Sequence, residues 1–213
     1  MQSLKDGSMN DNNNKCKRRD VSPRAFPKLF GRLSRLAAMA VILWPIATAA
    51  QLTFGEEEIF QAARAGDTAG VDYLLKKGND VDKTGVGGIT VLIIAAANGY
   101  QDLLDLALQE GAQIDRQDDS GKTALGWAAQ RGHYTVVERL LDKGADLNLQ
   151  NRDGMSSLML AVKGRHLSVV QLMLGYKPDL TLLDYTGRGV LDLARETRDR
   201  RLEDMLGRAG AGN

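Results

Sequence analysis

From Phe54 onward, apolar residues stand in short groups that recur along the chain between polar stretches. Groups of large apolar residues within polar surroundings predict amphipathic helices that bury one stripe. Groups of small apolar residues precede them and predict first helices that pack closely against their neighbours. The large groups are Leu103-Leu104, Val136-Val137, Leu140-Leu141 and Val169-Val170, and the small groups are Ala95-Ala96, Ala128-Ala129, Ala161-Val162 and Ala194.

Glycine shows that these groups belong to a repeat of 33 residues, because three glycine series share this period without insertion. The series are Gly66, Gly99 and Gly132; Gly78, Gly111 and Gly144; and Gly88, Gly121, Gly154 and Gly187. Glycine favours the left-handed C-cap that we expect after each second helix. It also permits the positive φ of a tight turn. Thr90, Thr123 and Ser156 stand where a hydroxyl can cap each first helix.

The clearest unit begins with Asp-Asp-Ser-Gly-Lys-Thr-Ala-Leu-Gly-Trp-Ala-Ala at residues 118–129. It continues with Gly132-His133, with Val-Val-Glu-Arg-Leu-Leu at 136–141, and closes on Gly-Ala-Asp at 144–146. This pattern resembles the ankyrin repeat. The resemblance implies an all-α ankyrin-repeat solenoid, in which each unit is a β-turn followed by two antiparallel helices.

About five units are expected in the ankyrin-repeat domain at residues 51–213, and they lie at 50–82, 83–115, 116–148, 149–181 and 182–213. The first unit lacks the turn and the last has a charged outer face, so both are interpreted as caps of the stack. The histidine that the family places after its Thr-Pro-Leu triplet is replaced by Ile93, Gly126, Met159 and Asp192. The family's turn-stabilising hydrogen bond is therefore expected to be absent. Lys177-Pro178 replaces a capping Gly-Ala, which predicts a different turn there.

The first 50 residues have another character. Residues 1–23 are polar and are predicted to be a disordered leader. Residues 24–50 place Arg24, Lys28, Arg32 and Arg35 before an uncharged run that ends in small residues, the pattern of a secretory signal peptide. Cleavage is expected before Ala50 or Gln51. A retained membrane anchor is the alternative, although the run is shorter than a spanning helix and contains a proline.

Charge divides the chain at the same place. Residues 1–50 carry nine Lys and Arg against three Asp, whereas the remaining residues carry nineteen Lys and Arg against twenty-four Asp and Glu. An acidic repeat domain disfavours nucleic-acid binding, which needs clustered basic residues. The single cysteine, Cys16, lies in the segment expected to be removed, which is compatible with export to an oxidising compartment.

No catalytic, cofactor or metal site is predicted. His133 and His166 stand at the family's structural Gly-His position and have no cysteine to share a metal with. The turn around Gly88 lacks the lysine of a phosphate-binding loop. Trp127 is interpreted as a packing residue, with partner contact as the second reading.

The resemblance implies that a protein partner binds along a concave face made by the turn tips and first helices. The expected contact residues are Val86, Ile89, Asp119, Ser120, Lys122, Gln130, Arg131, Arg152, Asp153, Met155, Lys163, Tyr185 and Arg188.

The predicted function is a non-enzymatic interaction module, periplasmic or secreted, that serves as an accessory or stabilising partner of another exported protein. The alternatives are an inhibitor or immunity-like regulator of an enzyme, a membrane-tethered scaffold subunit and a host-directed effector. The residues do not identify the partner.

Overall fold

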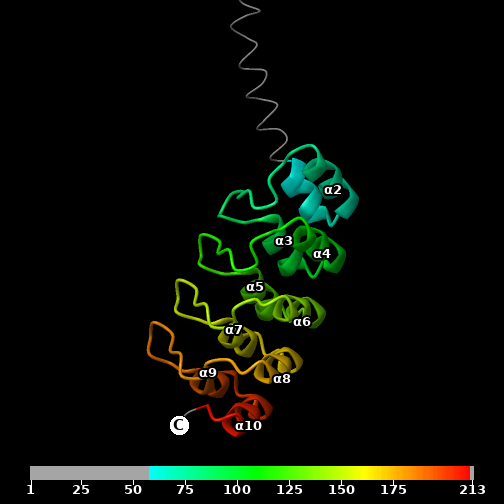
Figure 1. The fold of residues 1–213 in the computed structure, drawn as a ribbon. Helices are drawn as coiled ribbons and strands as arrows, with labels where there is room; N and C mark the ends of the chain where they lie inside the picture. Colours follow the sequence, from blue (N-terminus) through cyan, green and yellow to red (C-terminus); the bar gives the residue numbers. More distant parts are fainter. Residues whose placement is uncertain (1–57, 212–213) are drawn as a thin grey trace, which may run out of the picture. The chain divides into compact units, whose positions relative to one another are not determined.

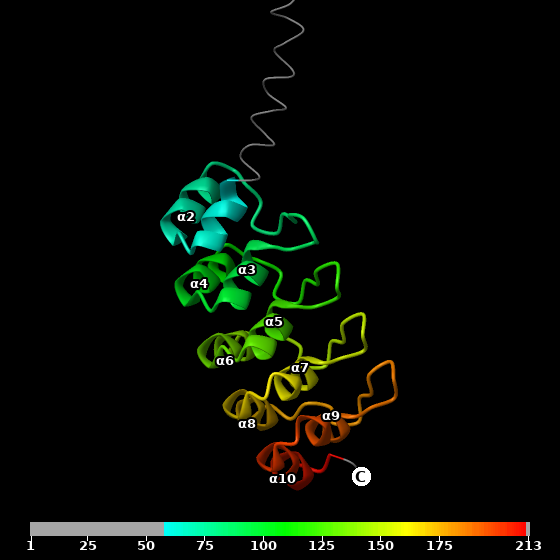
Figure 2. The same ribbon diagram turned by 180° about the vertical axis from the view of Figure 1, so that it is seen from behind.

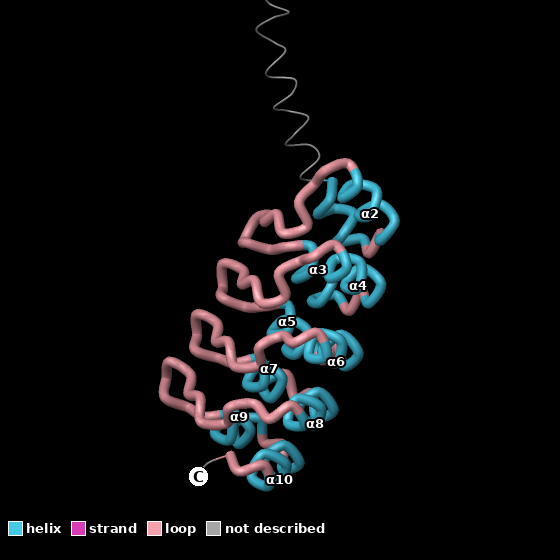
Figure 3. The backbone as a smooth tube through the Cα atoms, in the orientation of Figure 1, coloured by secondary structure: helices cyan, strands magenta, loops and turns pink. Residues whose placement is uncertain are grey.

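The computed structural model describes residues 58–211. The predictions for the leader, the signal peptide and its cleavage concern residues 1–50 and lie outside this part of the chain. The described residues form helices joined by turns and loops, and the only strand pairing among them is two isolated bridges (Figure 3). None of the helices within 58–211 is both long enough and apolar enough to cross a membrane.

The helices follow one another in pairs along the chain. Residues 58–65 are helical and precede α2 (Thr68–Lys76). The later pairs are α3 (Val91–Asn98) with α4 (Gln101–Gln109), α5 (Ala124–Arg131) with α6 (Tyr134–Asp142), α7 (Ser157–Lys163) with α8 (Leu167–Gly175), and α9 (Val190–Thr197) with α10 (Arg200–Arg208).

The pairs stack in sequence order and form two rows of helices (Figures 1 and 2). The inner helices α3, α5, α7 and α9 contact one another in turn, and so do the outer helices α2, α4, α6, α8 and α10. Small buried residues such as Ala96, Ala128 and Ala161 lie between the inner helices, where they allow close approach. Large buried residues such as Leu104 and Val137 come from the outer helices, so one continuous core runs between the two rows.

Hydroxyl caps start the inner helices where the sequence predicts them. The side-chain oxygens of Thr90, Thr123 and Ser156 accept hydrogen bonds from the backbone N–H groups three residues later, at 3.2, 3.1 and 3.4 Å. These bonds satisfy N–H groups that have no partner within the helix. Gly189 stands at the same position before α9, and its N–H donates to the Asp192 carboxylate at 3.1 Å.

The end of α8 corrects one prediction. Lys177 takes the left-handed φ of 55° that Gly144 takes at 87° one unit earlier, so the turn keeps its conformation. Its N–H donates to Leu174 O at 3.2 Å, as the Gly144 N–H donates to Leu141 O at 2.9 Å. The substitution does remove one bond, because Pro178 has no N–H to match the one that Ala145 donates to Leu140 O.

The long turns before the inner helices are joined to each other by backbone hydrogen bonds. They project from one side of the stack (Figures 1 and 2). One N–H in each turn donates to a carbonyl of the preceding turn: Asp119 to Gly87 at 2.9 Å, Arg152 to Ser120 at 3.0 Å, and Tyr185 to Asp153 at 3.1 Å. The turns therefore form a ladder that fixes the spacing of successive units.

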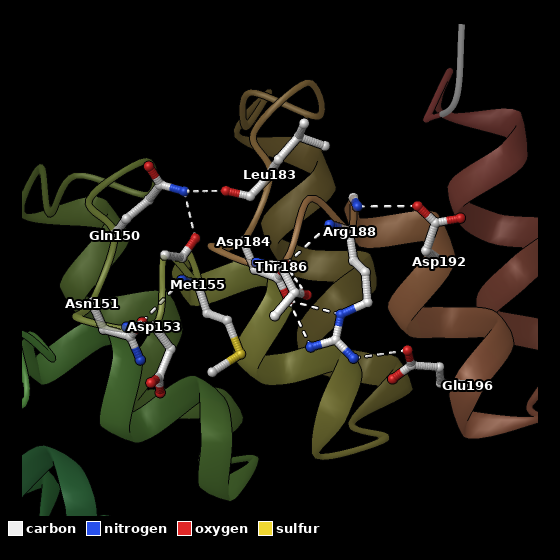
Figure 4. Close-up of polar contacts among 12 residues, drawn as sticks. Gln150, Asn151, Asp153, Met155, Leu183, Asp184, Thr186, Arg188, Asp192 and Glu196 are labelled. Carbon is white, nitrogen blue, oxygen red and sulfur yellow. Dashed lines mark hydrogen bonds and ion pairs between the residues drawn. The ribbon is translucent and has the colours of Figure 1, made fainter.

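A buried polar side chain holds each of the last three turns closed. The Oδ1 atoms of Asp118, Asn151 and Asp184 accept backbone N–H bonds from residues two and four positions later. The Asp184 carboxylate also receives the Arg188 guanidinium at 2.7 Å, and Arg188 pairs with Glu196 (Figure 4). Burial alone would raise the pKa of Asp184, but the hydrogen bonds from Thr186 and Arg188 hold it well below its usual range.

The loss of the family's turn-stabilising histidine bond is compensated in two units. The Trp127 indole N–H donates to Asp118 Oδ2 at 2.8 Å. The Arg188 guanidinium donates to the equivalent carboxylate of Asp184. These two turns are therefore anchored by different side-chain donors, each from its own unit, which the motif comparison does not reveal.

The ladder predicts that two glycines with the same backbone conformation differ in their tolerance of a side chain. A Cβ at Gly154 (φ +76°) would lie 2.7 Å from Tyr185 N, whereas nothing lies within 4 Å of a Cβ at Gly144 (φ +87°). We expect Gly144→Ala to lower the free energy of unfolding by about 1 kcal/mol through backbone strain. Gly154→Ala should lower it by at least about 2 kcal/mol, because the backbone of the next turn must also move. Urea unfolding followed by circular dichroism measures both, and equal losses would contradict the ladder.

The Asp184 carboxylate predicts a pH-dependent contribution to stability. Because its pKa is lower in the folded protein than the unfolded value of about 3.9, ionised Asp184 stabilises the fold above that value. This contribution is lost as the pH falls through the folded pKa. Asp184→Asn keeps an amide oxygen like that of Asn151 but loses the ion pair. The difference in unfolding free energy between the wild type and this variant should therefore be largest near neutral pH and shrink below about pH 4.

The exposed Asp204 on α10 provides a control for this experiment, because Asp204→Asn also removes one negative charge. Its difference from the wild type should not follow the same pH dependence. A constant difference for Asp184→Asn between neutral pH and about pH 2 would show that the carboxylate charge is not what stabilises the turn.

Candidate functional site

The predicted concave face corresponds to the surface formed by the long turns and the inner helices, which we call the inner face. Four successive turns present one residue each at the same position of the repeat: Val86, Asp119, Arg152 and Tyr185. All four side chains are exposed, with 90% of Val86 and 75% of Tyr185 open to solvent. The backbone N–H groups of Asp119, Arg152 and Tyr185 make the turn ladder, while all four side chains are available for contact.

Lys122 and Gln130 lie around Trp127 in the third unit. The Lys122 ammonium lies 3.7 Å from the centroid of the Trp127 ring, an attractive cation–π geometry. It also donates to Gln130 Oε1 at 3.0 Å. Burial lowers the pKa of Lys122, and the nearby positive charge of Arg131 adds to this effect. Asp118 and Asp153 oppose it.

Trp127 is held in a fixed orientation by the turn that precedes its helix. Its indole N–H donates to Asp118, whose other carboxylate oxygen accepts from Ser120 and from the Lys122 backbone. Burial favours the neutral form of Asp118, but these hydrogen bonds outweigh burial and lower its pKa. The acceptor is therefore an anion at neutral pH, and charge-assisted hydrogen bonds of this kind are strong.

Arg131 is fixed from the neighbouring unit. Its Nη1 donates to Ala97 O at 2.7 Å and to Asn98 Oδ1 at 3.3 Å, at the end of α3. Its Cζ lies 5.3 Å from the centroid of the Trp127 ring. The guanidinium is thus held beside the indole although the side chain is exposed.

A groove of about 290 Å³ opens beside these residues, between α3 and α5. It is lined by Arg64, Ile89, Ile93, Ile94, Ala97, Asn98, Trp127 and Arg131. Of the predicted contact residues, it brings together Ile89 and Arg131.

The other predicted residues differ in their availability. Met155 is only 7% exposed and packs in the hydrophobic core, so its side chain does not contribute to the surface. This corrects its inclusion among the contact residues, since the equivalent residues Ile89 and Lys122 are only partly buried. Arg188 is occupied by its ion pairs with Asp184 and Glu196. Asp153 and Lys163 are exposed on the turn of the fourth unit and at the end of α7, and Ser120 is exposed on the turn of the third.

Apart from Ile89 and Arg131, the residues that line the groove are not among the predicted contact residues, and Trp127 is predicted first as a packing residue. The repeat itself contained the signal. Ile94 and Asn98 stand one period before Trp127 and Arg131, and Arg64 stands one period before Ala97. Residues at equivalent positions of neighbouring units lie side by side, so the 33-residue spacing indicates that these side chains line one surface.

The histidines are structural but act between units. His133 Nε2 lies 3.1 Å from Ala97 O, and His166 Nε2 lies 3.0 Å from Gln130 O. Because a carbonyl can only accept, each ring donates to the preceding unit. Although the Gly-His position predicts hydrogen bonding within each repeat, both bonds cross a repeat boundary. Among residues 58–211, no three His, Cys, Asp or Glu side chains come together as metal ligands could.

Comparison with known families agrees with this geometry. A family model described as ankyrin repeats (three copies) matches residues 59–151, and one described as ankyrin repeats (many copies) matches residues 140–194. No curated protein matches the sequence. Ankyrin repeats indicate a protein–protein interaction module, and the family is generally non-enzymatic. The chain therefore carries ankyrin repeats over residues 59–194, and its predicted fold class, an all-α ankyrin-repeat solenoid, is confirmed.

Proposed function

We propose that this protein is a non-enzymatic binding module that holds a protein partner against its inner face. The observation that carries this proposal is the groove between α3 and α5, where Trp127 and Arg131 are held in place before any partner binds. Side chains that are already ordered lose little conformational entropy on association, so their contacts contribute more fully to affinity. Tryptophan and arginine are also among the residues that most often dominate interface energetics.

We further propose that the partner is an exported protein that this chain accompanies or stabilises in the periplasm or outside the cell. The pattern of residues 24–50 and the absence of cysteine after Cys16 support export. The acidic balance of residues 51–213 supports a protein partner over a nucleic acid. An inhibitor or immunity-like regulator would use the same face, and a retained N-terminal segment would make the protein a membrane-tethered scaffold.

The inner-face proposal predicts the effect of a triple substitution. Changing Arg131, Arg152 and Tyr185 to Ala should weaken binding of a co-purifying partner at least tenfold, because truncation of one interface anchor typically costs about 1 to 2 kcal/mol. The array should remain folded, because all three side chains are exposed, and only the loss of the Arg131 bonds to Ala97 O and Asn98 should lower its unfolding temperature slightly. Surface plasmon resonance against the purified partner measures the loss.

A matched control replaces Tyr73, Lys143 and Arg208, exposed residues on or next to the outer helices α2, α6 and α10. This variant should bind as the wild type does. If instead the control loses binding and the inner-face variant keeps it, the partner lies on the outer helices and the proposal fails.

Export predicts a defined mature mass. Protein recovered from its native host should begin at Ala50 or Gln51 and be found in the periplasm or the medium, as checked by intact-mass spectrometry after cell fractionation. Full-length protein in the membrane pellet would instead identify residues 24–50 as an anchor. An enzyme that co-elutes and regains activity when the chain is removed would favour the inhibitor.

A further inference from the structure

The groove between α3 and α5 combines an apolar floor with a positively charged rim. Five of its lining residues are apolar or aromatic: Ile89, Ile93, Ile94, Ala97 and Trp127. The rim carries two guanidinium groups, Arg64 and Arg131, and no carboxylate is among the lining residues. The positive charge of the lining therefore comes from Arg64 and Arg131.

The size of the groove restricts what it can hold. A volume of about 290 Å³ lies at the lower end of the range for small-molecule sites, and the groove is open to solvent at its rim. It suits one large aliphatic or aromatic side chain with the backbone passing over it. Burial of such a side chain against Ile89 and Trp127, the two partly exposed apolar residues of the lining, would supply apolar contact.

The rim adds a requirement for charge. Arg131 uses only its Nη1 for the bonds to Ala97 and Asn98, and a guanidinium has five N–H donors in a planar fork. The groups Nε and Nη2 take no part in these two bonds, and guanidinium groups recognise carboxylates in paired hydrogen bonds. Arg64 comes from the preceding unit and lines the same groove. An incoming negative charge would thus meet positive charge from two repeats.

We propose that the groove takes an extended segment of the partner protein in which an Asp or Glu stands next to a large apolar residue. The apolar side chain enters the groove against Ile89 and Trp127, and the carboxylate binds Arg131 with Arg64 adding long-range attraction. This inference rests on the proposed binding function and specifies the chemistry that the inner face recognises.

Trp127 provides a direct measurement. The chain contains two tryptophans, so Trp44→Phe in the full-length protein leaves Trp127 as the only indole. The probes are two blocked peptides, acetyl-Gly-Glu-Leu-Glu-Gly-amide and the same peptide with Gln in place of both Glu. The acidic peptide should change Trp127 fluorescence saturably and bind about fivefold or more tightly than its neutral counterpart. Because the rim charges are exposed, this preference should shrink in about 0.5 M NaCl.

Two further variants in the Trp44→Phe background locate the effect. Arg131→Gln should abolish the preference for the acidic peptide while leaving weak binding of the apolar residue. Arg208→Gln removes the same charge from the end of α10 and should leave the preference unchanged. Circular dichroism checks that both variants are folded.

Several results would overturn the inference. These are equal affinity for the two peptides, a preference that survives Arg131→Gln, and the absence of any saturable change up to about 10 mM peptide. A fluorescence change that depends on protein concentration without peptide, with dimers seen in sedimentation, would assign the groove to a second copy of the chain. If any of these occurs while the inner-face triple variant still loses its native partner, the proposed function stands and only the recognition chemistry is wrong.

Discussion

The structure depends on one constraint, which is that no unit can satisfy its polar groups or bury its apolar side chains alone. The hydrogen bonds that join neighbouring units each cross one repeat boundary. Tyr185 N–H reaches Asp153 O, Gln113 N–H reaches the Asp82 carboxylate at 2.9 Å, and His133 reaches Ala97 O. Inner helices can come close enough for these bonds only because small residues lie between them. The fixed period is therefore a physical requirement, since a single inserted residue would misplace every bond at that boundary.

The same constraint is met in part by side chains that link successive units. Gln117 Nε2 donates to Gln150 O at 3.1 Å, and Gln150 Nε2 donates to Leu183 O at 2.9 Å. Leu183 holds the next position in this series and has no side-chain amide. Leu183 therefore lacks the side-chain donor with which Gln117 and Gln150 reach the following unit. Asn148, at the end of the third unit, accepts the Asp179 N–H of the fourth unit at 2.9 Å, whereas the side chain of Thr181, one period later, donates back to Asp179 Oδ1.

The sequence was sufficient to predict the features that every unit must share. The hydroxyl caps at Thr90, Thr123 and Ser156 and the left-handed turn glycines follow from local chemistry, so their positions were predictable. Features that depend on what lies across a repeat boundary were not. Lys177 keeps a conformation for which glycine is the usual choice, and Met155 is buried where Lys122 is partly open. In both cases the outcome differs from the one that the residue type suggests, so a comparison of motifs does not show it.

Backbone groups join the turns to each other, so the exposed side chains of the turns can determine binding specificity. Asp119, Arg152 and Tyr185 occupy the same position in three successive turns, yet each makes the same hydrogen bond to the preceding turn because that bond uses only backbone groups. Trp127 is different, since its indole N–H donates to Asp118 in the turn of the third unit and its ring lines the groove. Any ligand that binds the folded groove also stabilises the fold by mass action. Because Trp127 belongs both to the groove and to this turn, a ligand in the groove should first raise the stability of the turn of the third unit and of the contact between α3 and α5.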